Sequence, residues 1–298
     1  MREALVPVRA PFRLDLTAVA MRRLSTNVVD TFDGTAYRRL LGDPRDPVLL
    51  SVEQPEPAAL AVRFEGTGAD AFDPVAIVRR ALGIDVDLAP FYAGAATIPW
   101  LDRLAHGARG VRPPRYPSLW ETVVNAVVYQ QISIHAAGAI LRRVIERYAA
   151  PVDAHGSRLF PFPASSTLRD ADPAELRDLG LSINKINALK SIAAAIGTGD
   201  LDEAALEPLP TPDLLTALAA HKGIGPWTAA VIALRGFGRL DLFPMKDSGA
   251  TALLRKLSGD EEIEVETVLE RLRPQQGMLY YHLLLGRLDA TGEVRLAF

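Results

Sequence analysis

Short alternations of apolar and polar residues mark the first part of the chain. They occupy residues 12–16, 48–52 and 59–64, and a period of two is typical of strands with one buried face. Between the last two runs, residues 54–57 read Gln-Pro-Glu-Pro, which favours a hairpin connection because proline presets a turn and cannot donate to a strand ladder. The pattern predicts an N-terminal antiparallel sheet.

Helix signals begin at Asp73-Pro74 and dominate from about residue 97. Asp73 can cap free amides, the proline suits the first helical position, and Gly83 should end that helix. Ser118 and Glu121 form a capping-box pattern ahead of an apolar helix over 119–129. Further helices are expected after residue 133, at Asp172-Pro173, at Ser182 and at Thr211-Pro212.

These elements predict an α+β fold in two parts. An N-terminal antiparallel β/α domain is expected at residues 1–95 and a mostly α-helical region at residues 96–298. The proline-rich stretch 112–117 is the expected crossing between them.

Two apolar helices flank Lys222-Gly223-Ile224-Gly225 within residues 214–236. The glycines permit positive φ and close backbone approach, and the proline at 226 suits the start of the second helix. The amides from Gly223 to Thr228 would then lie at a helix N-terminus, where they can bind a phosphate oxygen. The alternative is a turn with no ligand. A dinucleotide fingerprint is excluded because no strand precedes the turn and the third glycine is missing.

Composition narrows the class of protein. With 49% hydrophobic and 23% charged residues among 298, the chain is typical of a globular protein. No cysteine is present, which excludes disulfides, thiolate metal sites and a cysteine nucleophile. No run of 18 apolar residues and no signal-like N-terminus occur, so we expect a cytoplasmic protein without membrane segments.

Charge alone does not identify a partner. The net charge is −3, yet residues 101–150 carry seven basic and three acidic groups. This excess fits either a local nucleic-acid footprint or a solvated helix face.

Four separated elements, in order, carry a family resemblance. They are Tyr129-Gln130-Gln131-Ile132-Ser133, the hairpin at 222–225, Trp227-Thr228-Ala229, and Asp241-Leu242-Phe243-Pro244-Met245-Lys246-Asp247. Over about residues 115–290 the sequence resembles the helix-hairpin-helix (HhH-GPD) DNA glycosylases, most closely the 3-methyladenine DNA glycosylase II (AlkA-like) branch. The resemblance implies a helical glycosylase body of two subdomains with the active-site cleft between them.

The resemblance implies that Asp247 is the catalytic carboxylate. Cleaving an N-glycosidic bond builds positive charge on the sugar, which a carboxylate in a water-poor site stabilises. The alternative role is a helix cap, and both roles can coexist. Bifunctional relatives carry a nucleophilic lysine two residues after the second hairpin glycine, where this chain has Trp227. A monofunctional enzyme is therefore expected, with Lys246 as the rival nucleophile.

The resemblance also assigns a base pocket and a DNA-binding set. Trp227 is expected to stack on the everted base, with core packing as its alternative, and Gln131 stands at the wedge position, with a polar helix end as its alternative. The pocket residues are Trp227, Tyr129, Val231, Gln275, Tyr280 and Tyr281. The DNA-binding residues are Gln130, Gln131, Lys222, Gly223, Ile224, Gly225 and Thr228. A monovalent cation could bind the backbone carbonyls of Ala219, His221 and Gly223.

The sequence thus predicts a monomeric glycosylase that excises alkylated bases, such as 3-methyladenine and 7-methylguanine, from duplex DNA and leaves an abasic site. No cofactor is expected, and the five histidines show no metal-ligand spacing. The alternatives are an oxidised-purine glycosylase of the 8-oxoguanine type and a catalytically silent DNA-binding protein.

Overall fold

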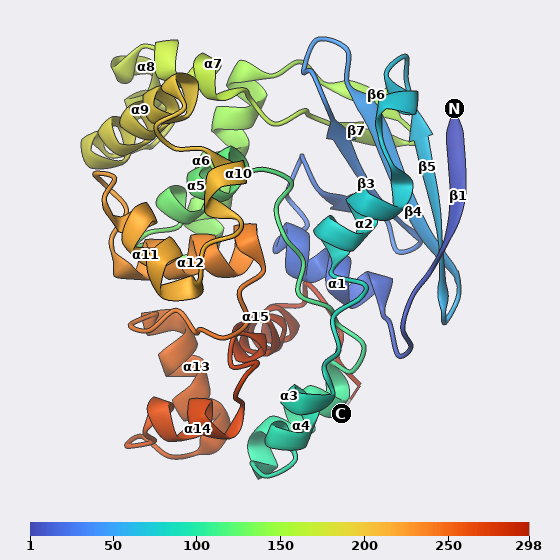
Figure 1. Ribbon diagram of the computed structural model, residues 1–298, viewed down its shortest axis with the longest axis vertical. Helices are drawn as coiled ribbons and strands as arrows, with labels where there is room; N and C mark the ends of the chain where they lie inside the picture. The colour runs from blue at the N-terminus through green and yellow to red at the C-terminus, as the bar shows by residue number, and fades with distance from the viewer. Residues whose placement is uncertain (298) are drawn as a thin grey trace.

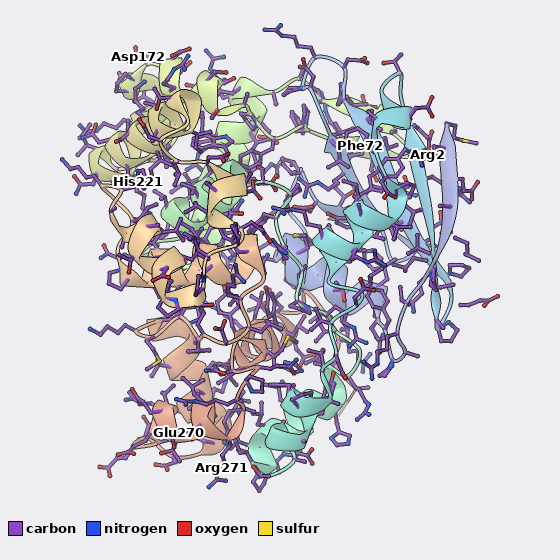
Figure 2. All side chains as sticks on the ribbon, in the orientation of Figure 1. Arg2, Phe72, Asp172, His221, Glu270 and Arg271 are labelled. Carbon is purple, nitrogen blue, oxygen red and sulfur yellow. The ribbon has the colours of Figure 1, made fainter. Side chains whose placement is uncertain are left out.

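The computed structural model describes residues 1–297 and, among them, every side chain except that of Ser248. A five-stranded antiparallel sheet forms one side of the molecule, in the order β1-β5-β4-β3-β2 (Figure 1). Its strands are β1 (Arg2–Pro7), β2 (Thr31–Phe32), β3 (Ala36–Leu41), β4 (Val48–Glu56) and β5 (Ala59–Glu65). At the sheet edge, Arg2 donates to the carbonyls of Asp70 and Phe72, which joins β1 to the 3₁₀ turn η1 (Ala69–Ala71) (Figure 2).

Two of the three predicted strands are confirmed. β4 and β5 pair as a hairpin, although β4 runs through Pro55 to Glu56 and leaves only two residues for the turn. The register shifts between Glu53 and Glu56, and this irregularity is how a proline is tolerated in the strand.

The strand predicted at residues 12–16 is wrong, because the helix α1 (Leu14–Arg22) begins there. Six consecutive residues of α1, from Leu16 to Met21, are buried. A helix that is covered on all sides loses its polar face, so periodicity could not distinguish it from a strand.

The helix start at Asp73 is confirmed: Asp73 accepts from the amide of Val75 at 2.9 Å, and Gly83 ends α2 (Pro74–Leu82) with φ of 59°. Two further helices, α3 (Ala89–Ala95) and α4 (Pro99–Gly107), precede the extended stretch at 112–117. The amides of Arg115 and Tyr116 there bond to the carbonyls of Ala81 and Arg235, so this stretch lies between α2 and the helical body.

The helical body predicted after residue 97 is confirmed, with 49% of the structure helical in agreement with the α+β fold class. Its helices are α5 (Leu119–Val128), α6 (Ile134–Tyr148), α7 (Ser165–Asp170), α8 (Pro173–Asp178), α9 (Ile183–Thr198), α10 (Glu203–Leu206), α11 (Thr211–Ala219), α12 (Pro226–Phe237), α13 (Ser248–Ser258), α14 (Val265–Arg271) and α15 (Met278–Ala290).

A second sheet of two short strands, β6 (Val152–Ala154) and β7 (Ser157–Leu159), was not predicted. Each strand has three residues, too few for a visible period. The turn between them holds His155 and Gly156 at positive φ, and Leu159 packs on Leu40 and Leu49 of the main sheet.

Besides the small cluster around Leu159, three large hydrophobic clusters organise the molecule. One lies between the main sheet and helices α1 and α2, one gathers α5, α6, α9, α11 and α12, and one gathers α3, α4, α13 and α15. Leu16 and Val19 of α1 belong to the third cluster, so the N-terminal segment enters a helical core. The division into domains at residue 95 stays a prediction.

Between Met1 and Ala297 no helix has the length and hydropathy needed to cross a membrane.

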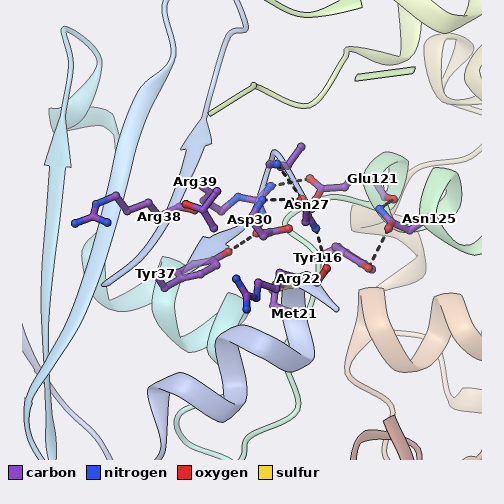
Figure 3. Close-up of polar contacts among 12 residues, drawn as sticks. Met21, Arg22, Asn27, Asp30, Tyr37, Arg38, Arg39, Tyr116, Glu121 and Asn125 are labelled. Carbon is purple, nitrogen blue, oxygen red and sulfur yellow. Dashed lines mark hydrogen bonds and ion pairs between the residues drawn. The ribbon is translucent and has the colours of Figure 1, made fainter. Parts of the chain in front are cut away.

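A buried ionic network joins the sheet to α5 (Figure 3). Arg39 of β3 donates to Asp30 and to Glu121, both at 2.8 Å, and Tyr37 donates to Asp30 at 2.5 Å. The capping box is therefore half formed. Ser118 accepts from the amide of Glu121, but the Glu121 carboxylate turns to Arg39 instead of the helix end. Burial and the nearby Asp30 raise the pKa of Glu121 to about 7.

This raised pKa predicts a pH-dependent stability. At pH values between the usual pKa of a glutamate and about 7, the folded chain binds more protons than the unfolded chain. The free energy of unfolding therefore falls as pH rises through this range. Glu121→Gln removes this titration. We expect the variant to lose up to about 3 kcal/mol of the change between pH 4.5 and 7.5, measured by urea unfolding. Glu146→Gln, which breaks an exposed pair with Arg142, is the control. Equal pH profiles for Glu121→Gln and wild type would contradict this prediction.

Candidate active site

A cavity of about 970 Å³ opens between the second and third hydrophobic clusters. Tyr129 and Leu242 pack against both clusters, which places the cavity where the two groups of helices meet. Its wall combines the α5–α6 loop, the starts of α9, α12 and α13, one side of α15 and the residue that follows α1. A second cavity of about 630 Å³, beside β6 and β7, is lined by none of the predicted site residues.

Asp247 lines the large cavity and also caps α13. Its Oδ1 accepts from the amide of Ala250 at 2.9 Å, and its Oδ2 accepts from the indole Nε1 of Trp227 at 3.2 Å. One donor on each oxygen fixes the orientation of the carboxylate. The capping role and a position facing the cavity therefore occur together.

The predicted hairpin is formed by α11 and α12 (Figure 1). Gly223 has φ of 95°, and a Cβ there would lie 2.3 Å from the Cβ of Ala188 on α9, so both backbone and packing require glycine. Gly225 is different. Its φ is −85°, and a Cβ on it would meet nothing within 4 Å. The space beside this residue, at the start of a 12-residue helix, is open.

The first amides of α12 take no part in the backbone hydrogen bonds of the helix. Ile224 donates to the carbonyl of His221, and the next amide to find a backbone acceptor is that of Ala229, which donates to Gly225 at 2.9 Å. A helix N-terminus with free amides suits an anion. Lys222, Gly223 and Gly225 are exposed beside it, whereas Ile224 is buried in the core.

Gln130 joins the α5–α6 loop to the hairpin. Its side-chain amide donates to the carbonyl of Gly223 at 3.0 Å and to Oγ1 of Thr228 at 2.8 Å. Lys185 holds the same loop, since its Nζ donates to the carbonyls of Val128 and Gln130, and burial lowers its pKa. The side chains of Gln130 and Thr228 are thus engaged within the protein.

The neighbouring residues of that loop face outward. Gln131 is exposed with φ of 58°, and Ile132 keeps 38% of its surface exposed. The sequence pointed to Gln131 alone as the wedge. The exposed side chain of Ile132 beside it was missed because a single isoleucine is ordinarily a core residue.

Four of the six predicted pocket residues line the cavity: Tyr129, Trp227, Val231 and Tyr280. The other two do not. Tyr281 is fully buried and donates to the carbonyl of Pro114 at 3.1 Å. Gln275 is tied to the α3 region, donating to the carbonyl of Asp87 and accepting from the amide of Phe91. Tyr281 follows Tyr280 on a helix and therefore points to a different side.

Two carbonyls of the predicted cation site already accept hydrogen bonds. Gly223 accepts from Gln130, and His221 accepts from Ile224. Each carbonyl keeps a second lone pair, so cation binding stays a prediction. The part of the chain that the structure describes contains no cluster of three His, Cys, Asp or Glu side chains able to hold a metal.

Charge gathers at the cavity from distant segments. Its charged lining consists of one carboxylate, Asp247, and four cations, Arg23, Lys185, Lys246 and Arg287. The arginines of residues 101–150 behave otherwise: Arg115, Arg142 and Arg147 pair with Glu207, Glu146 and Glu175. The basic excess noted in that segment is only partly neutralised, and a separate group of positive charges lines the cavity.

Arg23 and Arg287 were missed by sequence reasoning. Arg23 directly follows α1, far from every recognised motif, and Arg287 lies on α15 with its Nη1 2.8 Å from the position that a Cβ on Gly249 would take. No local pattern links an arginine at residue 23 to an aspartate at residue 247.

Comparison with known proteins agrees with this architecture. Residues 124–275 match the family model of the HhH-GPD superfamily base excision DNA repair protein. The chain is 30% identical over 280 residues to the probable bifunctional transcriptional activator/DNA repair enzyme AlkA of Mycobacterium tuberculosis, covering 93% of this chain and 55% of that protein. It is 28% identical over 189 residues to the DNA-3-methyladenine glycosylase of Bacillus subtilis, covering 61% of this chain and 62% of that protein.

Among solved structures, 3-methyladenine DNA-glycosylase from Archaeoglobus fulgidus has the same fold, with a TM-score of 0.77 at 22% identity, over 97% of this chain and 98% of that one. The chain spans little more than half the length of the curated relatives it matches. The hairpin, Asp247 and the aromatic cavity all lie within or next to the matched region. The chain belongs to the HhH-GPD superfamily of base excision DNA repair proteins, in its AlkA-like branch.

Proposed function

We propose that this protein is a monofunctional DNA glycosylase that everts a damaged base from duplex DNA, hydrolyses its N-glycosidic bond with Asp247 and leaves an abasic site. The observation that carries the proposal is that the Asp247 carboxylate and the open N-terminus of α12 line one cavity. In the proposed complex, amides at the hairpin hold a phosphate of the damaged strand while the carboxylate faces the sugar.

The size and lining of the cavity support base eversion. A volume of about 970 Å³ admits a purine with its sugar, and its wall combines aromatic faces with four cations that attract the DNA backbone. Trp227 uses its indole N–H on Asp247, which leaves its ring face free to stack on a base. Alkylated bases are the proposed substrates, because the two relatives named above are described as a DNA repair enzyme AlkA and a DNA-3-methyladenine glycosylase.

In the proposed complex, the α5–α6 loop fills the gap left by the everted nucleotide. We assign this role to Gln131 and Ile132 together, since Ile132 offers apolar bulk and Gln131 can bond to the orphaned base. Gln130 and Thr228 act by holding this loop against the hairpin.

Strand cleavage should be absent. Trp227 stands where bifunctional relatives carry their lysine, so we expect base release from a duplex with one 7-methylguanine to yield strand breaks only after alkali. Lys246 lines the cavity next to Asp247 and is the rival nucleophile. Borohydride should trap no protein–DNA adduct in wild type. An adduct that disappears in Lys246→Ala but persists in Lys256→Ala, an exposed lysine of α13, would contradict the monofunctional assignment.

A further inference from the structure

One face of α15 lines the cavity and ends in a positive charge. Its residues are Tyr280, Leu283, Leu284 and Arg287, at the spacing i, i+3, i+4 and i+7 of a single helix face. With a rise of about 1.5 Å per residue, Tyr280 and Arg287 lie about 10 Å apart along the helix axis. The face thus runs from an aromatic ring through two apolar side chains to a cation. This order matches a nucleotide, which has a flat base at one end and a charged phosphate at the other.

Arg287 lies beside the Asp247 carboxylate without pairing with it. A Cβ on Gly249 would lie 2.8 Å from Nη1 of Arg287 and 3.4 Å from Oδ1 of Asp247, so both groups border the space beside this glycine. Within residues 1–297, Arg287 forms no ion pair with any carboxylate. Its guanidinium is half-buried, and its charge is left for an anion from outside the chain.

The other three cations of the cavity are less suited to binding an anion. Arg23 is only 3% exposed, and Lys185 already donates to two backbone carbonyls. Lys246 is exposed, so solvent and salt screen its charge. Arg287 combines partial burial with a planar fork of donors that matches the oxygens of a phosphate.

The Asp247 carboxylate makes such a cation necessary. In the proposed reaction it approaches a sugar that carries a phosphate on each side, and like charges repel. The amides at the start of α12 are proposed to hold one of these phosphates, which leaves the other without a partner. A cation next to Asp247 offsets the repulsion and can bond to that second phosphate.

We propose that Arg287 binds the second phosphate of the everted nucleotide, the one that the hairpin does not hold. The two phosphates are then fixed on two walls of the cavity, α12 and α15, and the sugar between them faces Asp247. Gly249 makes this arrangement possible, because a side chain there would displace the guanidinium. The inference rests on the proposed glycosylase function and adds a phosphate site to it.

Neutralising one phosphate at a time tests this assignment. The probe is a duplex with a tetrahydrofuran abasic-site analogue, with a methylphosphonate replacing the phosphate on its 5′ side, on its 3′ side or on neither. On the fully charged duplex, we expect Arg287→Met to weaken binding about tenfold and to reduce the slope of log affinity against log salt by about 1. On one of the two methylphosphonate duplexes, Arg287→Met should bind within about twofold of wild type, because the contact that it removes is already absent.

The hairpin provides the matching measurement. Gly225→Ala should lose its effect on the other methylphosphonate duplex, because the hairpin holds the other phosphate. Arg287→Lys, which keeps the charge but not the fork of donors, should retain part of the binding. Arg103→Met is the control, since it alters an exposed arginine of α4 outside the cavity and should bind all three duplexes as wild type does.

A purely structural role of Arg287 gives a different result. The residue lies in the last turn of α15, where a cation can stabilise the helix end, so the thermal midpoint of each variant is measured as well. Should Arg287→Met fail to fold, Gly249→Ala provides the test. Its methyl group would displace the guanidinium while every charge is kept, and it should lose its effect on the same methylphosphonate duplex that we expect for Arg287→Met.

Three results would overturn the role of Arg287. They are equal weakening of all three duplexes by Arg287→Met, dependence of Arg287→Met and Gly225→Ala on the same phosphate, and a phosphate-dependent loss in Lys246→Met but not in Arg287→Met. Wild type that binds the abasic analogue but releases no 7-methylguanine would instead overturn the proposed glycosylase function, and the dependence on each phosphate would still be measured.

Discussion

Asp247→Asn is expected to lower single-turnover base release about a thousandfold while leaving DNA binding nearly unchanged. A carboxylate about 4 Å from the positive charge that develops on the sugar interacts with it by about 4 kcal/mol at an effective dielectric near 20. That energy corresponds to roughly a thousandfold in rate. Asparagine has almost the same shape, but it loses the charge and the second oxygen, which accepts from the indole N–H of Trp227.

The structure explains why this substitution should preserve the fold. Asparagine is a good N-cap, so it can still accept from the amide of Ala250 and preserve the start of α13. The free energy of unfolding should change by about 1 kcal/mol or less. The measurement is release of 7-methylguanine from a labelled duplex, together with a binding titration on the same duplex.

A matched control exists elsewhere in the chain. Asp172 caps α8 in the same way, by accepting from the amide of Ala174 at 2.9 Å, and it is not part of the cavity. Asp172→Asn should leave base release unchanged. If Asp247→Asn retained release within a few-fold of wild type, Asp247 would not be the catalytic carboxylate. Wild type that binds the duplex without releasing any base would support the binding-only alternative.

Gly223→Ala and Gly225→Ala are expected to have opposite consequences, although the residues are two positions apart. At Gly223 a methyl group would meet the Cβ of Ala188 at 2.3 Å, and the φ of 95° disfavours any side chain. Strain and overpacking together should cost about 2–5 kcal/mol of unfolding free energy. At Gly225, φ is ordinary and the space is open, so stability should change by about 0.5 kcal/mol or less.

The loss at Gly225 should appear in DNA binding instead. A methyl group at the start of α12 would project into the space where we place a phosphate, so we expect Gly225→Ala to weaken duplex binding about tenfold. Urea unfolding and a binding titration at fixed salt measure the two effects separately. Wild-type binding by Gly225→Ala would contradict the phosphate role of the hairpin, whereas an unaltered unfolding curve for Gly223→Ala would contradict the packing argument.

Interactions between neighbouring residues made many of the helix starts predictable from the sequence. Asp73, Ser118, Asp172 and Ser182 each accept from an amide in the first turn of the helix they precede, so those helix starts follow from neighbouring residues alone. The hairpin glycines and Asp247 could be identified likewise, because turn geometry and capping depend on adjacent residues. Two of the predicted pocket residues, Tyr129 and Trp227, lie in the ordered motifs of the family.

Other features depend on contacts between distant segments. Residues 14–16 start a helix, and the sheet and α15 together bury most of α1, so the alternation of buried and exposed positions expected for a surface helix is missing from the sequence. The Glu121 carboxylate accepts from Arg39 of the sheet at 2.8 Å and therefore does not bond to the amide at its own helix end. Gln275 and Tyr281 do not line the pocket because they donate to the carbonyls of Asp87 and Pro114, which lie far away along the chain.

The sequence by itself determined where most helices begin, where the hairpin turns and which acid stands beside it, since each of these is decided by a few consecutive residues. Only the tertiary structure decided that Arg23 lines the cavity and that the positive charge gathers there from four separate segments. The physical reason is that burial and charge balance are sums over neighbours in space, and these neighbours are brought together only by folding.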